Sequence, residues 1–95
     1  MRLDDHSRAV IRDAGERFFG AAVYLFGSRL DDSRRGGDID LFLEAGLPAE
    51  ELVRRETAMI AWIWRRIGER EIDLVIDSGR QSLQIYEAGR RGVRL

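Results

Sequence analysis

The 95 residues, 44% of them hydrophobic and 35% charged, predict one small domain (residues 1–95) with a modest core, which excludes a multidomain polymerase. The 16 basic and 17 acidic side chains nearly cancel, so we expect no direct binding of nucleic acid through attraction to its phosphates. The chain has no cysteine and no apolar run longer than seven residues, which excludes a secreted disulfide scaffold and a membrane span, and the expected location is the cytoplasm.

The first third of the chain predicts a helix, a strand and a loop. Residues 4–19 place apolar side chains at helical spacing, and Gly20 closes the helix. Residues 21–26 form a short apolar run bounded by glycines, which is typical of a buried strand. Residues 28–37 are polar and are therefore expected to form a surface loop.

A second strand is predicted over residues 38–44, where apolar and polar side chains alternate. Three aliphatic side chains share one face of this strand: Ile39, Leu41 and Leu43. The other face carries two acids and one aromatic ring: Asp38, Asp40 and Phe42.

The remaining elements are a long helix, a third strand and a short helix. Residues 49–69 form the long helix, and residues 71–77 alternate as the second strand does, which places Asp73 opposite the aliphatic side chains. Residues 81–91 are expected to form a short helix, followed by a frayed end or an edge strand over residues 92–95. The order αββαβα predicts a small α/β or α+β layer of at least three strands, with helices packed against one face.

Acidic side chains from two strands indicate a metal site. Asp38 and Asp40 project from the same face two residues apart, and two such carboxylates repel each other unless a divalent cation lies between them. Asp73 can add a third oxygen ligand from the next strand. Three carboxylates suit magnesium, which leaves its remaining positions to water and phosphate oxygens.

A phosphate-binding turn is predicted ahead of these acids. Gly27 follows a buried strand and permits backbone angles that let a phosphate approach the main chain. Ser28 offers a hydroxyl and an amide, and Arg29 is within reach of a phosphate tail. A phosphate cradle beside a carboxylate cluster is what transfer of a nucleotidyl group requires, since the chemistry is mostly positioning and charge neutralisation.

The string GSRLDDSRRGGDIDLFLE resembles the glycine-serine and Asp-x-Asp signature of the DNA polymerase beta nucleotidyltransferase superfamily, and EIDLVI resembles its third-acid strand. The short chain is most similar to the minimal nucleotidyltransferases, which include antitoxins encoded beside HEPN-domain toxins. The resemblance implies a small mixed sheet flanked by helices, with ATP as donor. Carried over by position, Gly27 and Ser28 hold the triphosphate, Asp38 and Asp40 hold two Mg²⁺ ions, and Asp73 binds one of them and activates the acceptor hydroxyl.

The resemblance also implies a role and a partner. In the HEPN-paired group, AMP is transferred to a tyrosine of the toxin, which silences its RNase activity, so the sequence predicts a protein adenylyltransferase that acts as an antitoxin. One alternative is an antitoxin with a vestigial site that neutralises its toxin by stoichiometric binding. A nucleotidyltransferase acting on a small molecule is less favoured, because no acceptor-binding domain accompanies the site.

Two further features carry predictions of their own. The run AMIAWIW, residues 58–64, presents apolar side chains in every direction around one helix, so at least one of Trp62 and Trp64 is expected to contact a partner. Asp77 shares a face with Asp73 but precedes Ser78 and a glycine, which favours a role in a turn or a cap.

Overall fold

The computed structural model describes residues 3–27, 39–80 and 83–95. Its elements follow the predicted order with small shifts at their ends: α1 (Asp5–Phe19), β1 (Tyr24–Phe26), β2 (Ile39–Glu44), α2 (Ala49–Ile67), β3 (Ile72–Asp77), α3 (Gln84–Arg90) and β4 (Val93–Arg94). At β1 the apolar residues 21–23 precede the paired segment, and α3 spans Gln84–Arg90 where the sequence predicted residues 81–91. For residues 92–95 the sequence predicted either a frayed end or an edge strand, and the structure has the edge strand, β4.

Both long helices end where the sequence places a glycine. The side chain of Asp4 caps α1 by accepting a hydrogen bond of 2.7 Å from the backbone N–H of Ser7. Gly20 then adopts a left-handed conformation with φ of 60° and donates its N–H to the carbonyl of Glu16. At the end of α2, Gly68 has φ of 89°, which also favours glycine. No helix in the described part of the chain is long and apolar enough to cross a membrane.

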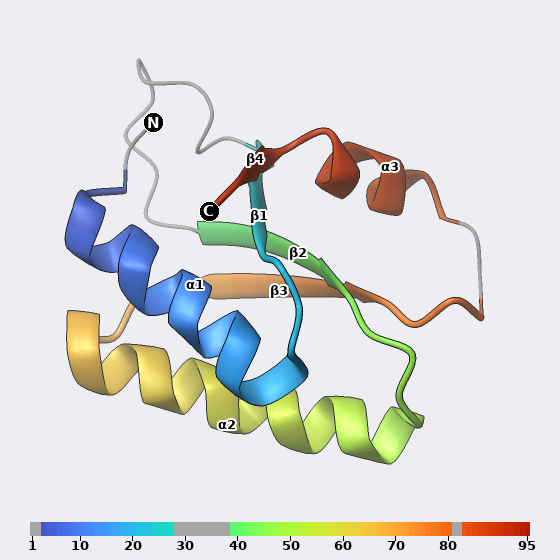
Figure 1. The fold of residues 1–95 in the computed structure, drawn as a ribbon, viewed down its shortest axis with the longest axis horizontal. Coiled ribbons are helices and arrows are strands. Elements are labelled where there is room, and N and C mark those ends of the chain that lie inside the picture. Colours follow the sequence, from blue (N-terminus) through green and yellow to red (C-terminus); the bar gives the residue numbers. More distant parts are fainter. Residues whose placement is uncertain (1–2, 28–38, 81–82) are drawn as a thin grey trace.

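The strands form a mixed sheet in the order β3-β2-β1-β4 (Figure 1). β2 lies between an antiparallel neighbour, β1, and a parallel neighbour, β3. The parallel pair is joined by the long helix α2, as a crossover between parallel strands requires. This topology brings the carboxyl end of β1 and the amino ends of β2 and β3 to the same end of the sheet.

The main core lies between the sheet and the two long helices, which run side by side below it in Figure 1. The aliphatic face of β2 is completely buried there, as the alternation predicted. Helices α1 and α2 contribute buried side chains of their own, including Ile11, Ala14, Met59 and Ile63.

The position of α3 corrects one prediction. We expected the helices on one face, but α3 packs on the opposite face of the sheet (Figure 1), where Tyr86 forms a second cluster with Phe26 and Phe42. A Cβ atom at Gly89 would collide with the Phe42 ring, so the missing side chain lets α3 approach closely. The sheet is therefore flanked by helices on both faces.

Candidate active site

The pairing of the strands brings two of the predicted acids together. In the parallel pair, Asp40 of β2 is the register partner of Asp73 of β3. Register partners on neighbouring strands point to the same face and lie about 5 Å apart. Two carboxylates separated by 32 intervening residues of sequence thus form one pair, on the face opposite the aliphatic core.

This pair lies on a part of the sheet that the described helices leave accessible. Asp73 is exposed and Asp40 is half-buried, whereas Ile39 and Leu41 on either side of Asp40 are completely buried. Helix α3 covers the same face through Tyr86, which packs against Phe42 and against Phe26, the β1 neighbour of Asp40. Among the described residues, the accessible side of the acid pair is therefore the side of Asp73.

Gly27 lies directly against the side chain of Asp40. It follows β1, in which Phe26 is the register partner of Asp40, and its φ of 75° is one that glycine adopts readily. A Cβ atom at this position would lie 2.5 Å from Oδ2 of Asp40. Gly27 thus has the positive φ that glycine permits, and its lack of a side chain makes room for the carboxylate, while its role in a phosphate turn stays a prediction.

Three predicted site residues lie outside the described residues: Ser28, Arg29 and Asp38. Their roles in the phosphate turn and in the metal site stay predictions. Within residues 3–27, 39–80 and 83–95, no group of three acidic or histidine side chains is close enough to hold a metal ion. The described part of the site is therefore the Asp40–Asp73 pair with Gly27 beside it.

The donor set of this pair fits magnesium. Carboxylate oxygens are the ligands that Mg²⁺ prefers, and it is commonly held by one or two of them together with water and phosphate oxygens. The two carboxylates lie on adjacent strands of one sheet, which is a rigid support, and Asp73 is open to solvent.

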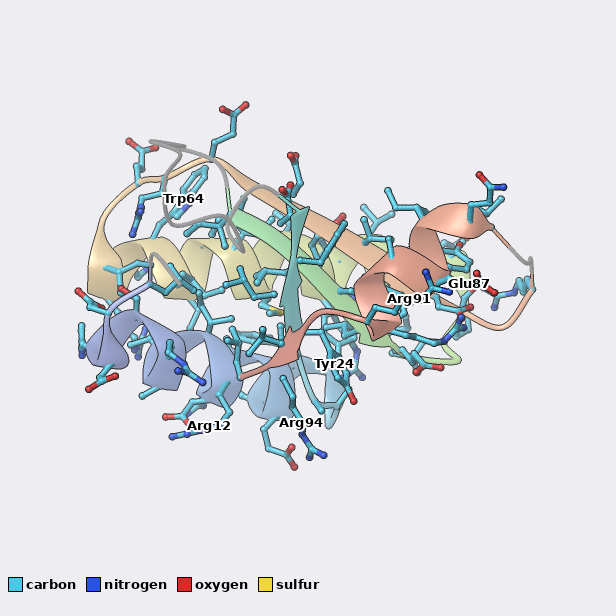
Figure 2. The ribbon with its side chains drawn as sticks, turned by 90° about the horizontal axis from the view of Figure 1, so that it is seen from above. Arg12, Tyr24, Trp64, Glu87, Arg91 and Arg94 are labelled. Atoms are coloured by element: carbon cyan, nitrogen blue, oxygen red, sulfur yellow. The ribbon has the colours of Figure 1, made fainter. Side chains whose placement is uncertain are left out.

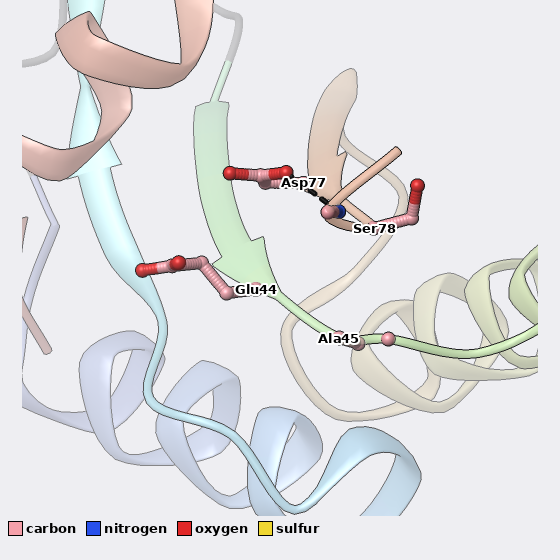
Figure 3. A pocket seen from close by; sticks show the side chains of 6 residues that line it. Glu44, Ala45, Asp77 and Ser78 are labelled. Carbon is pink, nitrogen blue, oxygen red and sulfur yellow. Dashed lines mark hydrogen bonds between the residues drawn. The ribbon is translucent and has the colours of Figure 1, made fainter. Parts of the chain in front are cut away.

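A second acidic pair occupies the opposite end of the same strands and has a structural role. Asp77, register partner of Glu44, is buried, accepts a hydrogen bond of 2.9 Å from the backbone N–H of Gly79 and forms an ion pair with Arg90 of α3. Figure 3 shows this region, where a shallow pocket of about 280 Å³ is lined by Glu44, Ala45, Gly46, Asp77, Ser78 and Gly79. The predicted turn role of Asp77 is confirmed.

The aromatic cluster between the two acidic pairs was missed by sequence reasoning. The Phe42 ring centre lies 6.2 Å from that of Tyr86 and 6.3 Å from that of Tyr24, and the Arg90 guanidinium lies over the Phe42 ring at 5.7 Å. The alternation of β2 had placed Phe42 on the acid face. The burial of Phe42 could have been inferred from Tyr86. That ring lies three residues before Gly89, on a short helix that needs a packing contact with the sheet.

Both tryptophans of α2 have contacts within this chain. Trp62 packs edge-on against Phe18 at 6.2 Å, and the Arg66 guanidinium lies 3.5 Å from its ring centre. Trp64, labelled in Figure 2, donates its indole N–H to the carbonyl of Arg70 at 2.8 Å. Each ring is half-buried, and the partner contact expected for this helix stays a prediction.

Comparison with known proteins agrees with the geometry. The model of a family described as a nucleotidyltransferase domain matches residues 7–90. These residues include the Gly27 turn and both acid-bearing strands, together with all three helices in large part or whole. No curated protein matches the chain.

Proposed function

This chain belongs to the nucleotidyltransferase domain family, and from that premise we propose that it transfers AMP from ATP to a tyrosine hydroxyl of a HEPN-domain toxin and so acts as the antitoxin of the pair. Transfer of a nucleotidyl group is the general activity of the family. To this general activity the proposal adds the identity of the donor, the identity of the acceptor and the role in the cell. The observation that carries it is the pairing of Asp40 with Asp73 beside Gly27.

Asp40 and Asp73, together with Asp38, would hold Mg²⁺ in this proposal. The bound ion supplies positive charge that offsets the charge of the phosphates and lowers the pKa of a bound hydroxyl. The two described carboxylates meet this need because their register places both on one face and on one row of the sheet.

The reaction is a substitution at the α-phosphorus of ATP. The acceptor oxygen forms a new bond to this phosphorus, the bond to the bridging oxygen of the β-phosphate breaks, and pyrophosphate leaves with the electron pair. Asp73 takes the proton of the acceptor hydroxyl, which suits a carboxylate on the exposed side of the pair.

Gly27, Ser28 and Arg29 would bind the triphosphate. The positive φ of Gly27 turns the chain immediately after β1, and the lack of a side chain there lets an anionic oxygen approach the main chain. Arg29 adds a charge that can form paired hydrogen bonds with a phosphate. These three residues orient the donor, and the acidic side chains act at the α-phosphate.

A protein acceptor agrees with the exposure of the site. The carboxylate of Asp73 is exposed at the surface of the sheet rather than enclosed in a small-molecule pocket. Nothing in the described part of the chain forms a second lobe over this surface. A tyrosine presented by another protein can therefore approach the pair directly.

The test is transfer of label from α-labelled ATP to the HEPN protein encoded by the neighbouring gene, with the intact mass of both proteins measured with and without ATP and Mg²⁺. Mass increments of whole AMP units on the neighbour are expected. Asp40→Asn and Asp73→Asn should each lower the rate at least about 100-fold, the order found when one charge-stabilising group is removed from an active site.

The matched control is Asp77→Asn, since Asp77 lies on the same strand and face but is bound to Arg90. Its folded fraction should transfer AMP at the normal rate. Undiminished transfer by Asp40→Asn would contradict the proposal. Neutralisation of the toxin by Asp40→Asn without any transfer would instead support the stoichiometric antitoxin.

A further inference from the structure

The outer edge of β3 presents backbone groups that no described strand pairs. β3 is the last strand of the sheet on this side. The carbonyl of Glu71, just before β3, accepts a hydrogen bond from Ile39, and the carbonyl of Asp77 accepts one from Ala45, just after β2. In a parallel ladder, alternate residues direct both of their polar groups to the same side. Three residues therefore point their N–H and C=O groups away from β2: Ile72, Leu74 and Ile76.

Apolar side chains flank this edge. The side chains of the same three β3 residues lie on the core face yet remain half-buried, in contrast to the fully buried aliphatic face of β2. Next to them, Val53, Ile60 and Trp64 of α2 share one stripe, because they are seven and four residues apart. Val53 is 62% exposed.

Contacts of α2 place this stripe on the β3 side. Trp64 hydrogen-bonds the carbonyl of Arg70, just before β3, whereas Arg55 and Trp62 contact Phe18 of α1 on the other flank. The stripe and the edge of β3 therefore form one continuous surface, which we call the β3 edge surface: Val53, Ile60, Trp64, Ile72, Leu74 and Ile76.

We propose that the β3 edge surface binds a second copy of this chain. The two β3 strands pair antiparallel about a two-fold axis that passes through Leu74, so Ile72 of each copy lies opposite Ile76 of the other. The two sheets then form one continuous sheet, and the two α2 stripes meet beneath it.

The hydrogen bonding of β3 selects this register. With Leu74 on the axis, all three outward-directed residues of each copy find partners within the strand, whereas a shift of one residue leaves one of them outside it. Asp73 then faces Val75 of the other copy, and Asp77 faces Glu71, which lies just before the strand. With Asp73 on the axis, Asp73 would face Asp73 of the other copy, an unfavourable pair of like charge.

The shape of the β3 edge surface favours a second copy of this chain over other partners. An extended peptide can satisfy the backbone groups of the edge but leaves the α2 stripe uncovered. A partner helix can cover the stripe but leaves the backbone groups unpaired. A second copy brings a strand and a helix in the same relative position, and a two-fold axis makes such a surface complementary to itself.

The first test is the mass of the full chain in solution by sedimentation or light scattering, from micromolar to millimolar concentration. A mass that rises to twice 10.9 kDa is expected. Ile60→Arg should keep the mass at that of the monomer, while Ile85→Arg, which charges a 45% exposed side chain on α3, should leave the dimer intact. A wild-type chain that stays monomeric at millimolar concentration would overturn the proposal.

Cross-linking tests the register and does not depend on the Ile60 variant. The chain has no cysteine, so Leu74→Cys introduces a single thiol. Hydrogen-bonded antiparallel partners have Cα atoms about 5.5 Å apart, within the range of a disulfide. Under mild oxidation this variant should form a linked dimer at least about tenfold faster than Ile85→Cys, because pairing raises the effective thiol concentration. Equal rates for two variants with native circular dichroism would exclude this register.

Discussion

The two faces of β2 are built from alternate residues of one strand, yet they have different roles. On one face, Ile39, Leu41 and Leu43 are completely buried under α1 and α2. On the other face, Asp40 lies at the accessible end, Phe42 is buried under α3, and Glu44 is exposed. Stability is therefore concentrated on one face, while the other is divided between an anchor for α3 and the proposed chemistry. Substitutions on the two faces should separate folding from transfer.

The largest effect is expected on the core face. Leu41→Ala removes a completely buried side chain at the centre of the sheet and should lower the free energy of unfolding by about 2–5 kcal/mol. Chemical denaturation monitored by circular dichroism measures it. Leu83→Ala, at a 44% exposed leucine, is the control and should change stability by less than about 0.5 kcal/mol. Similar losses in both variants would contradict the assignment of the core.

The next effect is expected where α3 meets the sheet. Gly89→Ala places a methyl group against the buried Phe42 ring and should cost about 1–3 kcal/mol despite the better helix propensity of alanine. Phe42→Leu should reduce this cost when combined with it, which a double-mutant cycle by denaturation detects. Strict additivity of the two substitutions would mean that the contact does not limit the packing of α3.

A smaller effect is expected at the second acidic pair. Asp77→Asn keeps the hydrogen bond to Gly79 but removes the charge that Arg90 contacts, which should cost about 1–2 kcal/mol. Asp73→Asn, on the same strand and face, should not lower stability, since it relieves repulsion from Asp40. Thermal melts in metal-free buffer compare the two. A larger loss for Asp73→Asn would show that the accessible acid has a structural role.

The smallest effect is expected at the start of α1 and depends on pH. The backbone N–H of Ser7 lowers the pKa of Asp4 below its usual value of 3.8, because the hydrogen bond favours the charged carboxylate. The stabilisation is therefore present above pH 3.8 and lost as the pH falls through the lower folded-state pKa. Asp4→Ala should lower the melting temperature slightly at neutral pH and by less in acid. A difference that grows in acid would contradict this cap.

Alternation along the strands made the acid face predictable. In residues 38–44 and 71–77, period-two patterns assigned Asp40 and Asp73 to the face opposite the aliphatic side chains, and the structure agrees. Gly20 was likewise predicted to close the first helix and Gly27 to adopt backbone angles that favour glycine, and both have positive φ. These features depend on local geometry, which a short window of sequence contains.

Long-range packing was not predictable in the same way. The pairing of Asp40 with Asp73 in one register depends on the crossover through α2, and no local pattern specifies that register. The placement of α3 depends on long-range contacts, such as that between Gly89 and Phe42, which are 47 positions apart in the sequence numbering. The aromatic run of α2 suggested an excess of apolar surface, but it gave no sign that Arg66 and the carbonyl of Arg70 would contact its tryptophans.

The parallel pairing of β2 with β3 has a consequence for the order of events during synthesis. Asp40 leaves the ribosome well before Asp73, and the two carboxylates acquire a common row only after α2 has crossed over and β3 has docked. A nascent chain that ends before β3 thus lacks half of the acid pair. The pair is complete once β3 lies against β2, when only β4 has still to join the sheet.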